Sequence, residues 1–226
     1  GGADAAKFSI NASTGALSFV TAPDYEAPTD SGGNNVYDVT VQVSDGTLSS
    51  TQAIAVTVTP VNDNTPAITS SATAGVAENS TAVLTVTATD ADLPVQTLSY
   101  SIVGGADAAK FSINASTGAL SFVTAPDFEA PTDAGADNVY DVTVQVSDGF
   151  LTDTQAIAVT VTPVNDNTPA IISSASANVA ENTTAVMTVT ATDAALPAQT
   201  LTYSTVGGAD AAKFAINSST GALSFV

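Results

Sequence analysis

The residues of this chain that could do chemistry are almost all carboxylates and side-chain amides. Its 226 residues include 22 Asp and Glu against three Lys, with no His and no Cys, and the net charge is −19. Without His or Cys the chain offers no imidazole base, no thiolate nucleophile and no ordinary zinc site. Oxygen-rich side chains in this number suit a hard cation such as Ca²⁺, which takes about six to eight oxygen ligands.

The acidic residues are clustered between apolar segments and are nearly absent from the segments themselves. The clusters of the central part are Glu78, Asp90-Ala-Asp92, Asp127-Phe-Glu129, Asp148 and Asn165-Asp166-Asn167. Like charges held together destabilise a fold unless a cation neutralises them, and Lys is too rare here to do so. The clusters therefore predict calcium sites, although Asp and Asn also form solvated turns with no ligand role.

The composition excludes several other functions. A polyanion does not hold nucleic acid or an anionic membrane surface, because both depend on Lys and Arg. No apolar run approaches the ~18 residues of a membrane span, so direct membrane insertion of this segment is not expected. Paired carboxylates occur in glycosidases, but the chain has no His, Arg or Trp that could hold a sugar. We do not expect an enzyme.

The chain is an internal repeat. The segment Gly-Gly-Ala-Asp-Ala-Ala-Lys-Phe begins at Gly1, Gly104 and Gly207, which gives a period of 103 residues. Only 18 of the 123 overlapping positions differ, so about 85% are identical. Solenoid units have about 20–50 residues, whereas a whole β-sandwich domain has about 100. The period therefore predicts a string of complete domains.

The polar, proline-bounded segments 60–66 and 163–169 are the natural linkers between these domains. Dividing the chain there gives one complete repeat at residues 66–168. The C-terminal part of another repeat precedes it at 1–65, and the N-terminal part of a third follows at 169–226. We expect the chain to be an excerpt from a longer protein, and the two partial repeats to be less stable than the complete one.

Short alternating segments predict the secondary structure. Apolar residues alternate with polar ones along 82–89, 140–147 and 157–162, with many β-branched residues, as in antiparallel strands with one buried face. Residues 114–118 and the pair Asp148-Gly149 indicate hairpin turns, and Asp107 is placed to cap a helical turn over 107–110. With the segment near 68–76, about seven strands are expected, which close naturally as a two-sheet sandwich.

Six motifs in this order resemble the cadherin repeat, particularly the bacterial cadherin-like kind found in very long surface proteins. They are Val-Ala-Glu78-Asn, Ala-Thr-Asp90-Ala-Asp92, Phe-Ser-Ile-Asn-Ala-Ser-Thr-Gly-Ala-Leu, Pro-Asp127-Phe-Glu129, Tyr140-x-Val-x-Val-x-Val-Ser-Asp148-Gly, and Val-Asn-Asp-Asn-Thr-Pro. The resemblance spans the whole chain. It implies an all-β fold of tandem seven-stranded Greek-key β-sandwiches, cadherin- or immunoglobulin-like.

The resemblance also implies calcium at each junction, with ligands from both neighbouring repeats and the linker. Carried over by position, the first junction uses Asp24, Glu26, Asn62, Asp63, Asn64, Asp90, Asp92 and Asp148. The second uses Glu78, Asp127, Glu129, Asn165, Asp166, Asn167 and Asp193. The chain departs from the family at Pro60 and Pro163, where an Asp is usual, and at Ala195, which replaces the second Asp of its pair. Fewer negative ligands imply fewer or weaker ions at the second junction.

The function that this implies is a calcium-binding extracellular or cell-surface module in an adhesion protein, where calcium stiffens tandem repeats into a rod. Its expected partners are neighbouring repeats, with other copies or a cell-surface ligand as further possibilities. One alternative is a homophilic or carbohydrate-binding module, although aromatic residues are only 6% of the chain. Another is a passive spacer in a large secreted enzyme.

Overall fold

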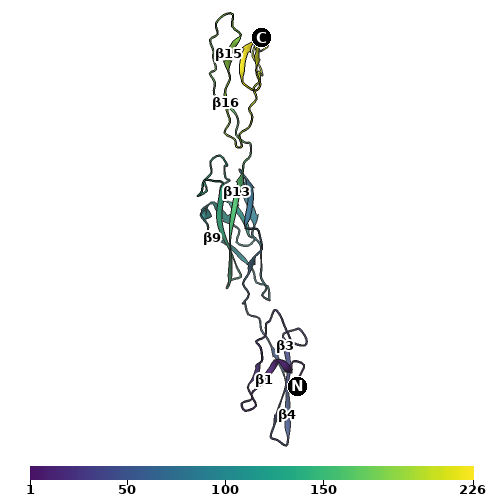
Figure 1. Cartoon of the computed structure of the whole chain (residues 1–226). Coiled ribbons are helices and arrows are strands. Elements are labelled where there is room, and N and C mark those ends of the chain that lie inside the picture. The colour runs from purple at the N-terminus through teal and green to yellow at the C-terminus, as the bar shows by residue number, and fades with distance from the viewer.

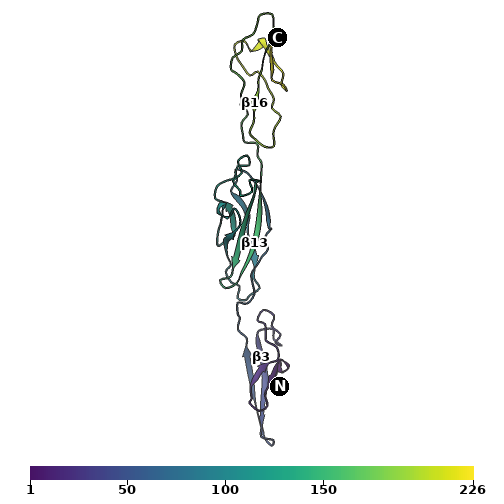
Figure 2. The ribbon, with the colours of Figure 1, turned by 60° about the vertical axis from the view of Figure 1, so that its left-hand side comes forward.

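The computed structural model describes residues 1–226 as a rod of three units arranged end to end (Figures 1 and 2). We call residues 1–65 the first unit, 66–168 the middle unit and 169–226 the third unit. The chain ends marked N and C lie in the outer units, at opposite ends of the rod (Figure 1). None of the helices is long and apolar enough to cross a membrane.

The middle unit contains nine strand segments and one short 3₁₀ turn. The turn is η2 (Ala108–Lys110), and it leads directly into β10. The strands are β5 (Ala67–Ile68), β6 (Thr73–Ala77), β7 (Ala82–Thr85), β8 (Ala88–Thr89), β9 (Ser99–Gly104), β10 (Phe111–Ile113), β11 (Ala119–Phe122), β12 (Val139–Ser147) and β13 (Thr152–Thr162).

These segments form the two main layers of a sandwich. One sheet has the order β6-β13-β12-β9, and the other has the order β10-β11-β7, while β5 pairs with β8. All pairs are antiparallel except β6 with β13, which is parallel. Counting β5 with β6 and β7 with β8 as interrupted strands gives the seven expected from the sequence. The predicted all-β class of tandem sandwiches is confirmed.

The core lies between the two sheets and follows the alternation in the sequence. Val142 and Val144 of β12 and Val159 of β13 are almost completely buried and belong to a cluster of 11 residues. The polar residues between them face outward. Phe111 and Phe122 are both buried and stack with ring centroids 4.6 Å apart. The longest strands are therefore anchored by burial on one face, which fixes their register.

The outer units carry the same elements in part. The first unit has η1 (Ala5–Lys7) and two hairpins, and the third unit has η3 (Ala211–Lys213) and five strands. The strands are β1 (Phe8–Ile10), β2 (Leu17–Phe19), β3 (Val36–Ser44), β4 (Ser49–Thr57), β14 (Ala170–Ile171), β15 (Ala185–Thr188), β16 (Ala191–Thr192), β17 (Phe214–Ile216) and β18 (Ala222–Phe225).

Two local predictions need correction. The alternating segment 82–89 is not one strand, because β7 pairs with β11 whereas β8 pairs with β5. Residues 107–110 do form a helical turn, but the side chain of Asp107 makes no capping hydrogen bond. Its carboxylate instead accepts the backbone N–H groups of Ala134 at 2.7 Å and Asp141 at 2.9 Å. Asp107 therefore joins a distant loop to β12, which no local pattern reveals.

Candidate metal centre

The loop after β11 carries Asp127 and Glu129, and we call it the acidic loop. Hydrogen bonds with residues at and just before the start of β12 hold its backbone in place. The hydroxyl of buried Tyr140 accepts the backbone N–H of Thr132 at 3.2 Å. Asn138, in the left-handed region at φ 62°, donates from Nδ2 to the carbonyl of Phe128 at 3.0 Å. These contacts fix the backbone on both sides of Glu129. The position of the Asp127-Phe-Glu129 carboxylates is therefore set by β12, which begins after the loop.

Glu78, at the end of β6, is 3% exposed and joins three parts of the middle unit. Its Oε1 accepts the N–H of Val164, in the linker, at 2.6 Å. Its Oε2 accepts the N–H of Phe128, in the acidic loop, at 2.8 Å. One oxygen of Glu78 also lies within 4.8 Å of carboxylate oxygens of Asp127 and Glu129. Residues about 50 positions apart in the chain thus form one acidic group at the second junction.

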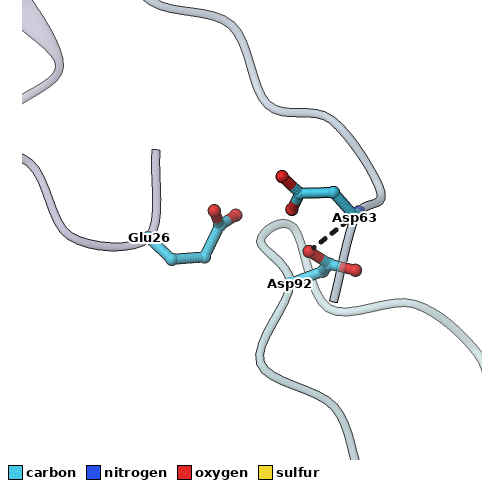
Figure 3. Close-up of side chains that lie close together, drawn as sticks. All are labelled: Glu26, Asp63 and Asp92. Atoms are coloured by element: carbon cyan, nitrogen blue, oxygen red, sulfur yellow. Dashed lines mark hydrogen bonds between the residues drawn. The ribbon is translucent and has the colours of Figure 1, made fainter. Parts of the chain in front are cut away.

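The first junction brings together carboxylates from two units and the linker between them. Glu26 comes from the first unit, Asp63 from the linker and Asp92 from the middle unit, and their side chains converge on one space (Figure 3). One oxygen from each lies within 4.8 Å of the others. Asp92, which is 1% exposed, accepts the Asn64 side-chain N–H at 2.8 Å and the Asp63 backbone N–H at 3.4 Å.

A second acidic group adjoins the first and shares Asp92 with it. Asp90, Asp92 and Asp148 again place one oxygen each within 4.8 Å of the others. The side-chain amide of Asn62 faces this group, and its Nδ2 donates to Oδ2 of Asp148 at 3.0 Å and to Oδ2 of Asp92 at 3.2 Å. Asn62 therefore ties the linker to both carboxylates.

The charges at the first junction shift the acidity of its members in opposite directions. Burial and the negative charges of Asp92, Glu26 and Asp24 raise the pKa of Asp63. The side-chain hydrogen bond from Asn64 lowers the pKa of Asp92, against the effect of burial. Asp63 therefore carries its charge in unfavourable surroundings, which a bound cation would relieve.

The donor set fits calcium by two observations. Oxygens on opposite sides of a Ca²⁺ ion are about 4.6–5.2 Å apart, since each lies about 2.3–2.6 Å from the ion. In each acidic group the carboxylate oxygens lie within 4.8 Å of one another, close enough to contact one such ion together. Oδ2 of Asp90 and Oε2 of Glu129 are buried with no hydrogen-bond partner, which is costly without a ligand.

The residues predicted for the second junction are only partly brought together. Glu78, Asp127 and Glu129 form the acidic group described above. Asp166 accepts Nδ2 of Asn79 at 2.6 Å and Nδ2 of Asn167 at 3.0 Å. Asn165 is exposed and makes no side-chain contact of this kind. Asp193 accepts only the N–H of Ala195, two residues further along the chain.

The corresponding residues of the first junction are more fully assembled. Seven of its eight predicted residues contact one another or belong to the two acidic groups: Glu26, Asn62, Asp63, Asn64, Asp90, Asp92 and Asp148. Asp24 stands slightly apart, because its Oδ1 accepts the N–H groups of Glu26 and Ala27. Its charge still acts on Asp63.

One contributor was not predicted from the sequence. Asn79 follows Glu78, adopts φ 62° and donates to Asp166 in the linker. The repeated pair Glu-Asn, seen again at 181–182, is the signal that could have indicated it. Asn is the residue other than Gly that most readily adopts positive φ, so its presence after a repeated Glu marks a tight turn at the strand end.

Comparisons with known proteins agree with this geometry. Residues 72–164 match the Cadherin domain family. The chain is built from cadherin repeat domains. Human protocadherin Fat 1 is 30% identical over 93% of this chain and 5% of its own length, and human protocadherin gamma-A6 is 35% identical over 70% of this chain and 18% of its own. The structure of mouse cadherin-23 EC22-24 covers 97% of this chain and 71% of that chain, with TM-score 0.65 and 26% identity.

Cadherin repeats are calcium-binding modules of cell-surface proteins and are not enzymes, so the cofactor of this chain is Ca²⁺ and its location is extracellular. The relatives named above are animal protocadherins, which supports the cadherin resemblance but not its bacterial form. The chain spans only a small fraction of the length of these curated relatives.

Proposed function

We propose that the two junctions are the calcium sites of this chain and that calcium joins its repeats into a stiff rod. The observation that carries the proposal is the convergence of Glu26, Asp63 and Asp92, from three separate parts of the chain, on one space (Figure 3). A cation there neutralises the shared charge. Through the shared cation, Glu26 of the first unit, Asp63 of the linker and Asp92 of the middle unit are then held together.

The proposed ligands are those predicted by position. At the first junction they are Asp24, Glu26, Asn62, Asp63, Asn64, Asp90, Asp92 and Asp148. At the second they are Glu78, Asp127, Glu129, Asn165, Asp166, Asn167 and Asp193. We also place the domain boundaries in the linkers, at 65/66 and 168/169. The family match over 72–164 and the self-contained core of the middle unit support these boundaries.

Thermal unfolding in calcium and in chelator tests the proposal. If each site has a Kd of about 10⁻⁴–10⁻³ M, 10 mM Ca²⁺ stabilises by about 1.4–2.7 kcal/mol per ion. For a unit of roughly 100 residues this raises Tm by about 6–20 °C. Magnesium at the same concentration serves as the control, because it prefers a smaller octahedral site and keeps its water.

A matched pair of variants locates the effect. Asp148→Asn removes one negative charge from the group formed by Asp90, Asp92 and Asp148, so it should reduce the calcium-dependent rise in Tm. Asp141→Asn makes the same change at an exposed residue outside both groups and should leave that rise intact. An equal rise in both variants, or no rise in the parent chain, would mean that the carboxylates are solvated turns.

For the whole protein we propose an adhesion or spacer role at a cell surface, in a long tandem-repeat protein of the bacterial cadherin-like kind. The 85% identity between repeats, about one difference in seven positions, supports growth by duplication. Association with other copies is a second candidate, because a related structure is a cis-dimer of protocadherin gammaB7 EC3-6, 25% identical with TM-score 0.64. Analytical ultracentrifugation of the chain in calcium separates the two.

A further inference from the structure

The two junctions of this chain are held by different numbers of contacts. Seven hydrogen bonds join residues 1–65 to the middle unit, five of them from the linker to Asp92, one from the linker to Asp148 and one from Leu93 to Glu26. A single hydrogen bond joins the third unit to the rest, from the N–H of Leu196 to Oε1 of Glu129 at 2.7 Å. The difference lies mainly in the contacts that Asp92 makes.

Ala195 occupies the position of Asp92 and has no oxygen to replace its contacts. Both residues are 1% exposed, so Ala195 is buried as deeply at its junction as Asp92 is at the first. At the second junction the linker turns back to the unit it leaves: Asp166 accepts Nδ2 of Asn79 and Nδ2 of Asn167. Asp63, at the equivalent position, donates its N–H forward to Asp92.

The acidic groups differ in the same sense. Each group at the first junction contains Asp92, and one of them spans both units and the linker. The group at the second junction, Glu78 with Asp127 and Glu129, lies entirely within the middle unit. A cation bound there neutralises the middle unit without holding the third unit, for which Asp193 is the one carboxylate near the junction.

We propose that Ala195 makes the second junction a hinge that stays mobile at calcium concentrations that already stiffen the first. This inference rests on the proposed function and adds to it a graded response along one rod. Asp92 acts as the residue that couples ion binding to the alignment of two units. Because Ala195 replaces this Asp at the second junction, ion binding there does not align the middle unit with the third. The calcium midpoint for ordering should therefore be at least about tenfold higher at the second junction.

Distance distributions between spin labels across each junction test this directly. The chain has no Cys, so labels attach only where Cys is introduced. Thr51→Cys with Thr154→Cys spans the first junction, and Thr154→Cys with Ser219→Cys spans the second, all at exposed positions. The distances are measured by EPR as free Ca²⁺ is increased. The distance distribution across the first junction should narrow at a Ca²⁺ concentration at least about tenfold below that needed for the second junction.

Exchanging the residue at the key position provides the decisive variants. Asp92→Ala should raise the calcium midpoint of the first junction to that of the second, and Ala195→Asp should lower the midpoint of the second. Asp92→Asn keeps an acceptor for Asn64 but loses the charge, so it should also raise the midpoint. This variant answers the question if Asp92→Ala fails to fold.

The outcomes separate this inference from the function on which it rests. If both junctions narrow at the same calcium concentration, or the exchanges at 92 and 195 leave the midpoints unchanged, the hinge is refuted while calcium stiffening stands. If neither distribution responds to calcium, the proposed function fails and the hinge fails with it.

Discussion

Replacing Glu78 by Ala should destabilise the middle unit even before calcium is added. Glu78 is 3% exposed and accepts backbone N–H groups from Val164 at 2.6 Å and Phe128 at 2.8 Å. A hydrogen bond to a charged group contributes about 1.5–3 kcal/mol to stability. At the lower value for each bond, two lost bonds cost about 3 kcal/mol of the free energy of unfolding.

That cost corresponds to a large shift in melting temperature. A unit of this size loses about 4–8 °C for each kcal/mol, so Tm should fall by about 12–24 °C. The measurement is thermal unfolding of the chain in chelator, followed by far-UV circular dichroism. In calcium the fall should be larger still, because Glu78 also belongs to the acidic group with Asp127 and Glu129.

The chain provides its own control for this substitution. Glu181 is the copy of Glu78 in the third unit, within the same Val-Ala-Glu-Asn sequence, but it is exposed. Glu181→Ala should therefore change Tm by little, since surface substitutions are usually within about 0.5 kcal/mol. If Glu78→Ala shifts Tm no more than Glu181→Ala does, the two backbone hydrogen bonds do not hold the linker and acidic loop as described.

Two further substitutions test the fold that positions the site. Gly118→Ala would place Cβ 2.1 Å from the carbonyl oxygen of Val86 at φ 71°, so it should cost more than the ~1–3 kcal/mol of backbone strain alone. Gly15→Ala, at the same φ but with open space around it, should cost only the strain, as chemical denaturation of each variant can measure. Burial alone would raise the pKa of Asp133, but backbone N–H donors outweigh it and lower that pKa. Its stabilising contribution is therefore complete above the unfolded value of about 3.9 and is lost as pH falls through the lower folded value. Asp133→Asn should reduce the acid sensitivity of Tm below about pH 4.

The comparison between the two glycine variants and the slope of Tm with pH are the observations that could contradict these expectations. Equal losses for the two glycine variants would mean that the turn at Gly118 is not packed against the backbone of Val86. An unchanged pH profile in Asp133→Asn would mean that its hydrogen bonds do not depend on charge.

The sequence by itself determined the fold class, the repeat and the type of cofactor. Alternating Val and Ile in β12 and β13 require one buried face, and a side-chain period of two permits only a strand. The 103-residue period follows from identity between copies and needs no structure. The absence of His and Cys together with clustered carboxylates restricts the metal to one that prefers oxygen, because ligand chemistry is a property of residue types.

Only the tertiary structure decided which of those residues meet. Asp92 and Ala195 occupy equivalent positions and are equally buried. Only Asp92 binds the linker, because its carboxylate accepts N–H groups from residues 28 and 29 positions earlier in the chain. Asp107 is placed by sequence to cap its own turn but contacts a loop and a strand that packing brings near. Sequence patterns report neighbours along the chain, whereas ligand geometry depends on contacts between distant segments that form only when both sheets close on a common core.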